Sequence, residues 1–480
     1  MQKYVVYGLG LSGISTAKFL AKNGEEVIAT DDNEEVLKAA EKNFSEEKFG
    51  IKFSKAGEIK FDANAVISFS PGIPLHFPKP HKILEIAKKS GATLACDIEI
   101  FYRKNSQQNF IAITGTNGKS TTTALTGFIF KELNFPAEIG GNIGVPCFDL
   151  PNFLNSLRRT SGAPHCGEPQ QNFSYIFETS SYQLDLLSET RFNIAALLNI
   201  TPDHIDRHGS LTAYIEAKKR IFRNQTAEDF ALIDVDNENS KKIFDELKSD
   251  KNFCATLVPI STKKIQENGV ALFDGILVNK ISGADSRIEL KSEFLRGQHN
   301  DQNMAFAFAI TYCHALRKSL PMPEEKIISA IKKFQGLRHR LQLVGEINGI
   351  KFINDSKATN AESTENALKA YEKIFWILGG KAKEGGISRL QPYFKKIHKA
   401  YLIGEASEEF AKVLEESSVT FEKCSTLDAA FARAISDTKN ISFSGSSILL
   451  SPACASFDQW KNFEQRGDHF CKLFNELQKS

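Results

Sequence analysis

Short apolar runs that end in glycine, serine or aspartate recur along this chain, and each is followed by sequence of helical character. In the first hundred residues these runs are YVVYGL, EVIATD and AVISFS, which begin at Tyr4, Glu26 and Ala65. Strands that alternate with helices predict parallel sheets covered by crossover helices. We therefore predict an α/β protein that begins with a Rossmann-like domain.

The length of the chain predicts more than one such domain. A chain of 480 residues exceeds what a single core can serve, and domains of roughly 100–200 residues predict three of them. The polar stretch 103–109 is interpreted as a linker, and the strand pattern restarts after Gly336 with KFIND, IFWILGG, AYLIG and SILLSP. The predicted domains are a Rossmann-like domain over 1–107, a central P-loop ATPase-like domain over 108–335 and a Rossmann-like C-terminal α/β domain over 336–480.

Composition narrows the class of protein. The hydrophobic share of 41%, the charged share of 25% and the net charge of +2 predict a soluble globular protein without the basic field that non-specific nucleic-acid binding uses. No stretch approaches the ~20 apolar residues of a membrane span, and no secretory leader is visible. The eight cysteines form no CxxC pair, so we expect reduced thiols in a cytoplasmic protein with neither nucleic acid nor membrane as partner.

The sequence AITGTNGKSTTT at 112–123 predicts a phosphate-binding loop between a strand and a helix. Glycines let backbone N–H groups curl around phosphate oxygens, Lys119 supplies a cation for the β- and γ-phosphates, and the Ser120 hydroxyl can hold Mg²⁺. The alternative is an ordinary strand-to-helix turn with a solvated lysine. The residues expected at a nucleoside triphosphate are Gly115, Thr116, Asn117, Gly118, Lys119, Ser120 and Thr121.

A second glycine turn, GLGLSG at 8–13, follows the first strand, and Asp31 and Asp32 end the second. Alone this pattern indicates a dinucleotide site and a dehydrogenase, but any nucleoside diphosphate, UDP included, can use such a turn. A tight turn that serves packing only is the third interpretation. Two nucleotide sites in one chain favour an enzyme that uses ATP to activate a nucleotide-carrying substrate.

The middle of the chain carries a carboxylate, an imidazole and a lysine that follow strand-like runs. Glu178 ends one strand, where it could reach the Mg²⁺ of the phosphate loop or could simply be solvated. His204 follows another strand, and Lys218 lies on the next helix. Spacing alone leaves His204 as an ordinary histidine and Lys218 as a surface lysine.

Several motifs together carry a resemblance that covers essentially the whole chain: GTNGKST, ETSSYQLD, TPDHIDRHGS with EAKKRIF, GQHNDQN, GLRHRLQ, INDSKATN, ILGGKAK and LLSPACASFDQWKNFEQRGDHF. They resemble the Mur ligase family. GTNGKST also occurs in folylpolyglutamate synthases, whereas DSKATN and SPACASFDQWKNFEQRG are similar to the members that add D-glutamate.

The resemblance implies an ATP-dependent, amide-forming ligase of peptidoglycan precursor synthesis. Its expected substrates are UDP-N-acetylmuramoyl-L-alanine and D-glutamate, joined through an acyl phosphate, and its expected state is a monomer. The expected cofactors are ATP and two Mg²⁺ ions, with Mn²⁺ as an alternative metal, and a CO₂-derived carbamate on Lys218.

The resemblance also assigns residues. Lys119, Glu178, His204 and Lys218 are the expected catalytic residues, and Ser120, Glu178, His204 and the Lys218 carbamate the expected metal ligands. The UDP-substrate is assigned to Gly10, Leu11, Ser12, Asp31, Asp32, Ser70, Gly72 and Asn142. Asn303, Arg340 and Asp355 join the phosphate loop in ATP binding, and D-glutamate is assigned to Lys357, Thr359, Lys383, Ser456 and Phe463.

The sequence departs from the family pattern at two places, and two alternative functions remain to be considered. Asp32 stands where a hydroxyl residue often contacts uracil, so the base contact could come from Asp31 or Asp32, and the polar loop 158–172 is longer than usual for the family. One rival is a superfamily member with another acceptor, but no DNPR-type motif of the diaminopimelate- or lysine-adding ligases is present. The other is a nucleotide-binding regulator without catalysis, against which the complete set of expected catalytic residues argues.

Overall fold

The computed structural model describes residues 2–47, 50–142, 145–151, 173–321, 324–382, 386–439 and 445–479. The chain forms two compact units, Met1–Lys291 with Gln298–Lys332, and Ser292–Gly297 with Lys333–Ser480. The expected loop 158–172 lies wholly outside the described residues. Within the part that is described, no helix is long and apolar enough to cross a membrane.

The first sheet of unit 1 is a small parallel sheet in the order β3-β2-β1-β4-β5. Its elements are β1 (Lys3–Tyr7), α1 (Leu11–Lys22), β2 (Glu26–Thr30), α2 (Glu34–Glu47), β3 (Ile51–Phe53), β4 (Ala65–Phe69), α3 (Lys82–Ser90), β5 (Thr93–Ala95) and α4 (Asp97–Asn105). The strand order reverses beside β1, and ligands of such sheets bind outside the carboxyl ends of the strands at this point. The glycine turn after β1 lies at this point.

The second sheet of unit 1 has the order β14-β13-β12-β11-β10-β9-β6-β8-β7. It is parallel from β7 to β12, and a hairpin adds β13 and β14 antiparallel at one edge. The strands are β6 (Asn109–Thr114), β7 (Ala137–Gly141), β8 (Ser174–Glu178), β9 (Ile194–Leu197), β10 (Phe230–Asp234), β11 (Thr256–Ser261), β12 (Val270–Phe273), β13 (Ile276–Asn279) and β14 (Ser286–Glu289).

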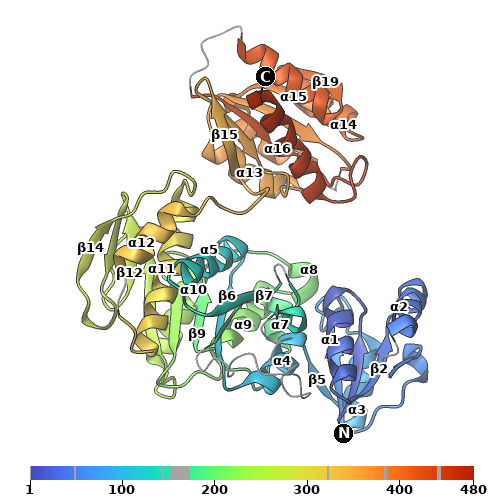
Figure 1. The fold of residues 1–480 in the computed structure, drawn as a ribbon. Helices are drawn as coiled ribbons and strands as arrows, with labels where there is room; N and C mark the ends of the chain where they lie inside the picture. Colours follow the sequence, from blue (N-terminus) through green and yellow to red (C-terminus); the bar gives the residue numbers. More distant parts are fainter. Residues whose placement is uncertain are drawn as a thin grey trace. The chain divides into compact units, whose positions relative to one another are not determined.

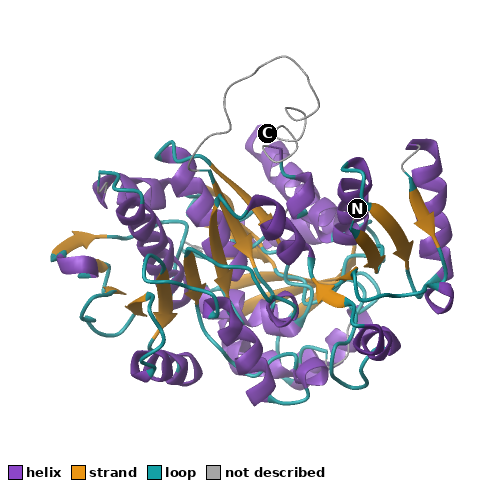
Figure 2. Ribbon diagram, turned by 90° about the horizontal axis from the view of Figure 1, so that it is seen from below, coloured by secondary structure: helices purple, strands orange, loops and turns teal. Residues whose placement is uncertain are grey.

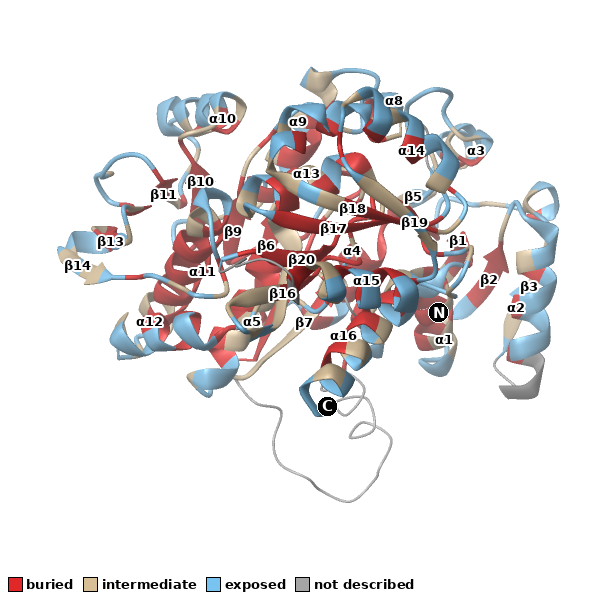
Figure 3. Ribbon diagram, turned by 90° about the horizontal axis from the view of Figure 1, so that it is seen from above, coloured by how far each residue is buried: buried red, intermediate tan, exposed pale blue. Residues whose placement is uncertain are grey.

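Figure 2 shows the strands of the chain with helices around them, and the central strands β6 and β9 are buried along their whole length (Figure 3). The helices of this part are α5 (Lys119–Glu132), α7 (Ser181–Asp185), α8 (Ile205–His208), α9 (Leu211–Lys219), α10 (Glu238–Ser249), α11 (Gln298–Arg317) and α12 (Glu324–Lys333). Figure 1 shows α5 beside α11, and the two helices pack together.

The stretch 103–109 is not the linker that its polarity suggests. Residues 103–105 form the last turn of α4, and β6 already begins at Asn109. Asn105 is buried and its Nδ2 donates to the Phe101 carbonyl at 2.9 Å. The polar side chains here therefore belong to a helix end and a strand start, with only 106–108 between them.

A buried carboxylate on α4, the helix that follows the first sheet, binds a loop that precedes β9 of the second sheet. Glu99 is fully buried and accepts hydrogen bonds from the backbone N–H groups of Ser188, Glu189 and Thr190 at 3.0–3.2 Å. The hydroxyls of Ser188 and Thr190 also donate to it, at 2.8 and 2.6 Å. Burial raises the pKa of this carboxyl, but the hydrogen bonds outweigh burial and hold the pKa below its ordinary value. Glu99 is therefore an ionised anchor between the two layers.

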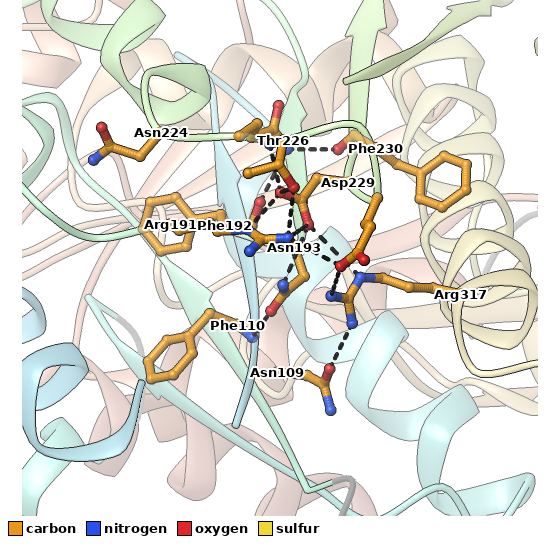
Figure 4. A network of polar contacts seen from close by, with 12 residues as sticks. Asn109, Phe110, Arg191, Phe192, Asn193, Asn224, Thr226, Asp229, Phe230 and Arg317 are labelled. Atoms are coloured by element: carbon orange, nitrogen blue, oxygen red, sulfur yellow. Dashed lines mark hydrogen bonds and ion pairs between the residues drawn. The ribbon is translucent and has the colours of Figure 1, made fainter. Parts of the chain in front are cut away.

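A second polar network lies where β9 and β10 begin (Figure 4). Asp229 is fully buried, and Arg191 donates to both of its oxygens, at 2.6 and 3.0 Å. Asn193 donates to it at 3.2 Å, and Arg317 at the end of α11 forms an ion pair at 3.6 Å. Arg317 also donates to Asn109, the first residue of β6. One carboxylate thus holds the start of two strands and the end of a helix.

Unit 2 is built on one mixed sheet in the order β15-β16-β20-β17-β18-β19, in which only β15 pairs antiparallel. Its elements are β15 (Gln342–Ile347), β16 (Ile350–Asn354), α13 (Ala361–Ala370), β17 (Ile374–Gly379), β18 (Ile397–Ile403), α14 (Ser407–Glu416), β19 (Phe421–Ser425), α15 (Leu427–Lys439), β20 (Ser447–Leu450) and α16 (Phe463–Lys479). Residues of β17 alternate between two cores, because Trp376 packs on one face and Phe375 on the other.

Candidate functional site

The phosphate loop connects β6 to α5, in the strand, turn and helix order that its sequence predicts. Gly118 has φ +86°, and a Cβ there would collide with Asn303 Oδ1. Another residue would be strained at this φ and would require the Asn303 side chain to move. The backbone N–H of Thr116 donates to the Asn199 carbonyl at 2.9 Å, and that of Asn117 to the Asn199 side chain at 2.9 Å. Asn199, which follows β9, therefore supports the loop from behind.

Lys119 opens α5 and folds over its own loop. Its Nζ donates to the carbonyls of Gly115 and Thr116 at 2.9 and 2.8 Å. Ser120 is half-buried in the first turn of the helix, and Thr121 is buried. Asn303 lies beside this loop, since its Oδ1 accepts from the Thr122 hydroxyl at 3.1 Å. The loop thus places an ammonium group and a hydroxyl at a helix N-terminus, where phosphate oxygens bind readily.

A cavity of about 340 Å³ opens beside the loop. Its lining residues come from both layers of unit 1: Pro71, Gly72, Lys119, Asn142, Ser180, Ser181, Tyr182, His204, Arg207, Tyr214 and Lys218. Four of the expected site residues (Gly72, Lys119, His204 and Lys218) and the expected muramoyl contact Asn142 therefore share one cavity.

Glu178 ends β8 at the back of this site and is 3% exposed. Its Oε1 accepts from Asn142 Nδ2 at 3.1 Å, whereas its Oε2 is buried without a hydrogen-bond partner among the described residues. Buried carboxylate oxygens nearly always have a hydrogen-bond partner. A buried oxygen without one, such as Glu178 Oε2, is therefore suited to bind a cation. No group of three His, Cys, Asp or Glu side chains in the described ranges could hold a metal unaided. A metal at Glu178 would therefore need ligands of another kind, such as Ser120 or phosphate oxygens.

Lys218, in the last turn of α9, is 1% exposed rather than solvated. Its Nζ donates to the Gly115 carbonyl at 2.9 Å and lies 4.7 Å from the centre of the Tyr214 ring. Burial, and then the charge of Lys119, lower the pKa of this amine well below its ordinary value, against the pull of Asp203 and Glu178. The expectation of a surface lysine from spacing is thus wrong, and the side chain lies at the phosphate loop.

His204 caps the short helix α8 in the left-handed conformation, with φ +52°. Strained positions of non-glycine residues are common at functional sites. Its ring faces the rings of Tyr182 and Tyr214, at 5.3 and 6.2 Å between centroids. The side chain is 47% exposed, and it lies 3.4 Å from Asp203. His204 is therefore available to a ligand in the cavity.

Sequence reasoning did not assign a role to the aromatic wall of the cavity. Tyr182 stacks on His208 with 8° between the ring planes, and the Arg207 guanidinium lies 4.9 Å above the same ring. Tyr214 hydroxyl lies 3.1 Å from the Thr116 hydroxyl. Tyr182, Arg207 and His208 belong to the motifs ETSSYQLD and TPDHIDRHGS. Tyr214 lies two residues before the motif EAKKRIF, so closeness to these motifs was the signal in the sequence.

The other glycine turn lies at the carboxyl ends of β1 and β2. A Cβ at Gly13 would collide with the Gly8 carbonyl, and Gly10 has no side chain to cap the first amides of α1. Leu11 is 81% exposed at this helix start. Ser12 is half-buried in the first turn of α1, and Ser70 follows β4 directly. The turn thus presents free helix amides at the switch point of the sheet.

Asp31 and Asp32 have different surroundings. Asp31 accepts from the backbone N–H of Leu9 at 2.7 Å and of Asn33 at 2.8 Å, so it holds the turn itself. Asp32 accepts from the Tyr7 hydroxyl at 2.7 Å and pairs with His81 at 3.0 Å, and its side chain is 57% exposed. Asp32 is therefore the more accessible of the two carboxylates.

The remaining expected residues lie in unit 2. Asp355 follows β16, is buried, and accepts from the Ser451 hydroxyl at 2.7 Å and the Leu341 N–H at 3.1 Å. Burial raises the pKa of this carboxyl to about 7. Arg340 is half-buried, and its Nη1 has no hydrogen-bond partner among the described residues.

Lys357, Thr359, Ser456 and Phe463 gather near the carboxyl ends of the neighbouring strands β16 and β20. The Lys357 ammonium lies 5.8 Å from the centre of the Phe463 ring. Ser356 Oγ donates to the Phe463 carbonyl at 2.8 Å, and Thr359 N–H donates to the Lys357 carbonyl. Ser456 is 2% exposed. Lys383, also expected here, lies outside the described residues.

Family models match three parts of the chain. They are a Mur ligase MurD-like N-terminal domain over residues 2–94, a Mur ligase middle domain over 113–311 and a Mur ligase glutamate ligase domain over 339–454. Among solved structures, the UDP-N-acetylmuramate-alanine ligase MurC of Thermotoga maritima matches with a TM-score of 0.55 at 16% identity, covering 99% of this chain and 100% of its own. MurF of Acinetobacter baumannii matches with a TM-score of 0.54 at 18% identity over 79% of each chain. These two structures show the shared fold.

Curated relatives match over almost their full length. The UDP-N-acetylmuramoylalanine--D-glutamate ligase of Rhodospirillum rubrum is 39% identical over 474 residues, which cover 98% of this chain and 94% of the relative. The enzyme of the same name from Rickettsia felis is 40% identical over 473 residues, with 98% and 96% covered. The three-domain α/β architecture, the matched models and these relatives agree, and the chain belongs to the Mur ligase family.

Proposed function

We propose that this chain is an ATP-dependent ligase that adds D-glutamate to UDP-N-acetylmuramoyl-L-alanine in peptidoglycan precursor synthesis. The observation that carries the proposal is the cavity that Lys119, His204, Lys218 and Asn142 share with Gly72 of the first layer. The relatives that match over nearly the whole chain bear the corresponding name. We further propose that the protein acts in the cytoplasm as a monomer.

ATP binding is assigned to the phosphate loop. The amides of residues 115–121 and the Lys119 ammonium hold the β- and γ-phosphates, and Lys119 exchanges its two carbonyl partners for phosphate oxygens. Asn303 sits beside the loop, while Arg340 and Asp355 are proposed adenine-nucleotide contacts of unit 2. Mg²⁺, or Mn²⁺ in its place, supplies charge neutralisation at the γ-phosphate when bound.

The metal ligands are proposed to be Ser120, Glu178, His204 and a carbamate on Lys218. The orphan Oε2 of Glu178 supports this assignment. The neutral amine of Lys218 attacks the carbon of CO₂, an N–C bond forms, and a proton leaves for solvent. The lowered pKa of Lys218 supports this step, because only the neutral amine is a nucleophile. The product is an anion whose oxygens can bind a cation that the ammonium would repel.

The reaction follows from the need to activate a carboxylate. The L-alanyl carboxylate attacks the γ-phosphorus, the bond to the β–γ bridging oxygen breaks, and ADP leaves. The amine of D-glutamate then attacks the acyl phosphate carbon, loses a proton, and inorganic phosphate departs from the tetrahedral intermediate. Lys119 stabilises the charge of the transferring phosphoryl group in the first step.

The two substrates occupy different parts of the chain. The diphosphate is assigned to the amides of Gly10, Leu11 and Ser12, with Ser70 and Gly72 nearby, and the muramoyl group to Asn142. Asp32 is proposed to meet the uracil, because both oxygens of Asp31 already accept backbone N–H groups. D-Glutamate is assigned to Lys357, Thr359, Lys383, Ser456 and Phe463, where ammonium and hydroxyl groups suit a dicarboxylate.

The function is tested by phosphate release from ATP with UDP-N-acetylmuramoyl-L-alanine and one amino acid at a time. D-Glutamate should support turnover, whereas L-glutamate, L-lysine and diaminopimelate should not. Turnover with another amino acid and none with D-glutamate would refute the proposal.

The phosphate loop assignment has its own test. Lys119→Ala should lower kcat by about 100-fold or more, because it removes a preorganised cation from the transferring phosphoryl group. Lys131→Ala, an exposed lysine in the last turn of the same helix, is the matched control and should keep kcat. Equal kcat in both variants would contradict the assignment.

A further inference from the structure

Arg466 is a cation without exposure to water, and the mechanism above gives it no role. It lies in α16, its exposed fraction is 0%, and among the described residues Trp376 alone is a larger fully buried side chain. Burial lowers the pKa of Arg466 to about 10, so the guanidinium is still charged at pH 7. Within the described ranges no carboxylate lies within ion-pair distance of it. Burying such a charge is costly unless its donors are satisfied.

Backbone carbonyls and one hydroxyl satisfy the guanidinium. Nη2 donates to the carbonyls of Ser356 at 2.9 Å and Cys454 at 3.0 Å. Nε donates to the Ser356 hydroxyl at 3.0 Å, and Nη1 to the Gly379 carbonyl at 3.4 Å. The planar fork of an arginine can serve several acceptors in fixed directions, which a lysine cannot do.

The acceptors lie at the carboxyl ends of three neighbouring strands. Ser356 follows β16, Cys454 follows β20, and Gly379 ends β17, in the sheet order β16-β20-β17. Parallel sheets bind ligands beyond this edge. One side chain therefore ties together three segments that are remote in sequence.

The same segments carry the residues proposed to bind D-glutamate. Lys357 and Thr359 follow Ser356 within three residues, and Ser456 follows Cys454 by two. The Ser356 hydroxyl, which accepts from Arg466, in turn donates to the Phe463 carbonyl. A Cβ at Gly380 would lie 3.2 Å from Arg466 Nη1 and would collide with the Ala455 carbonyl. The absence of a side chain at Gly380 therefore leaves room for the Arg466 guanidinium beside the strand ends.

We propose that Arg466 is a positioning residue that holds these three strand-end segments in the geometry of the amino-acid pocket. The identity of the amino acid as D-glutamate rests on the proposed function. Arg466 does not touch the substrate in this proposal, but sets the spacing between Lys357, Ser456 and Phe463 through the backbone.

Steady-state kinetics of Arg466→Lys test the proposal. The KM for D-glutamate should rise about 10-fold or more, since misplacement of binding groups by about 1 Å costs up to a hundredfold. The KM values for ATP and UDP-N-acetylmuramoyl-L-alanine should change less than about twofold. Arg433→Lys, an exposed arginine of the same unit that pairs with Glu422, is the matched control and should leave all three values unchanged. An unchanged KM for D-glutamate, or a parallel rise of all three values, would overturn the proposal.

Amide hydrogen exchange tests the same proposal without any substrate. In Arg466→Lys the amides of 356–359, 379–382 and 453–456 should exchange at least about 10-fold faster, while those of β18 and β19 keep their rates. Uniformly faster exchange across unit 2, or no change at the three segments, would overturn the positioning role. Phosphate release by the unaltered protein tests the proposed function separately, so the two failures are distinguishable.

Discussion

Burial changes the chemistry of Lys218 more than its sequence context could indicate. A lysine flanked by Glu216 and Arg220 on an amphipathic helix is ordinarily solvated. Here the amine is 1% exposed and lies between the phosphate loop and Tyr214. The lowered pKa is thus a property of tertiary packing, which no local pattern encodes.

The proposed carbamate on Lys218 leads to a spectroscopic prediction. Protein equilibrated with ¹³C-labelled bicarbonate should show one additional carbonyl carbon signal, because the neutral amine captures CO₂. The signal should disappear in Lys218→Arg. It should persist in Lys219→Arg, whose native side chain pairs with Glu246 instead. A signal in both variants would place the carbamate elsewhere.

Asp355 should make the stability of unit 2 depend on pH. Burial raises the pKa of its carboxyl to about 7 from about 4 in the unfolded chain. Between these values the folded state binds more protons, so the free energy of unfolding should fall as pH rises from 4 to 7, by up to about 4 kcal/mol. Denaturant titrations of the unaltered protein and of Asp355→Asn should therefore diverge above pH 5. Parallel stability curves for the two proteins would contradict a raised pKa.

The roles of residues within compact motifs could be predicted from the sequence. The roles of residues whose partners are remote in sequence could not. Lys119 and Ser120 follow from local strand, glycine and helix signals. The contacts that distinguish Glu99 and Arg466 are remote in sequence, since Ser188 lies 89 residues from Glu99 and Ser356 110 residues from Arg466.

At the scale of elements, the sequence predicts the parallel strands well. The apolar runs that begin at Tyr4, Glu26 and Ala65 correspond to β1, β2 and β4, and the runs KFIND, IFWILGG, AYLIG and SILLSP to β16, β17, β18 and β20. Parallel strands that are buried on both faces have short apolar sequences, and for this reason they can be predicted from the sequence. The hairpin of β13 and β14 was not predicted. Its edge strand SRIE alternates in burial and lacks an apolar run.

The network around Asp229 should stabilise the second sheet. Asp229→Asn should lower the free energy of unfolding of unit 1 by about 3 kcal/mol, because it leaves two arginines without their buried carboxylate. Urea unfolding followed by far-UV circular dichroism measures this. Asp245→Asn breaks an exposed pair with Lys241 and should cost less than about 1 kcal/mol. Similar losses in both variants would argue against a structural role for the network.

At the scale of the molecule, the three α/β domains expected from length are confirmed by three sheets and three matched family models, and the first two of them form one compact unit. The first two sheets share one hydrophobic cluster, which includes Val5, Phe101 and Tyr175. The proposed boundaries at 107/108 and 335/336 stay predictions. Chain length predicts the number of sheets correctly. It does not predict that the first two sheets pack against one shared hydrophobic core.

The two tryptophans permit the units to be followed separately. Trp376 and Trp460 both lie in unit 2, so tryptophan fluorescence reports on that unit, while circular dichroism reports on the whole chain. In Asp229→Asn the circular dichroism midpoint should fall and the fluorescence midpoint should stay. A fluorescence midpoint that moves by the same amount would show a single cooperative unit.

Glu99 connects α4, which follows the first sheet, to residues 188–190, which precede β9 of the second sheet. Under the proposed function, this connection sets the distance between the uridine and the phosphoryl group, and a substrate of matching length brings its carboxylate to the reacting phosphorus. One further residue in the substrate would add roughly 3.5 Å, so we expect the enzyme to select its UDP-substrate by length as well as by contacts.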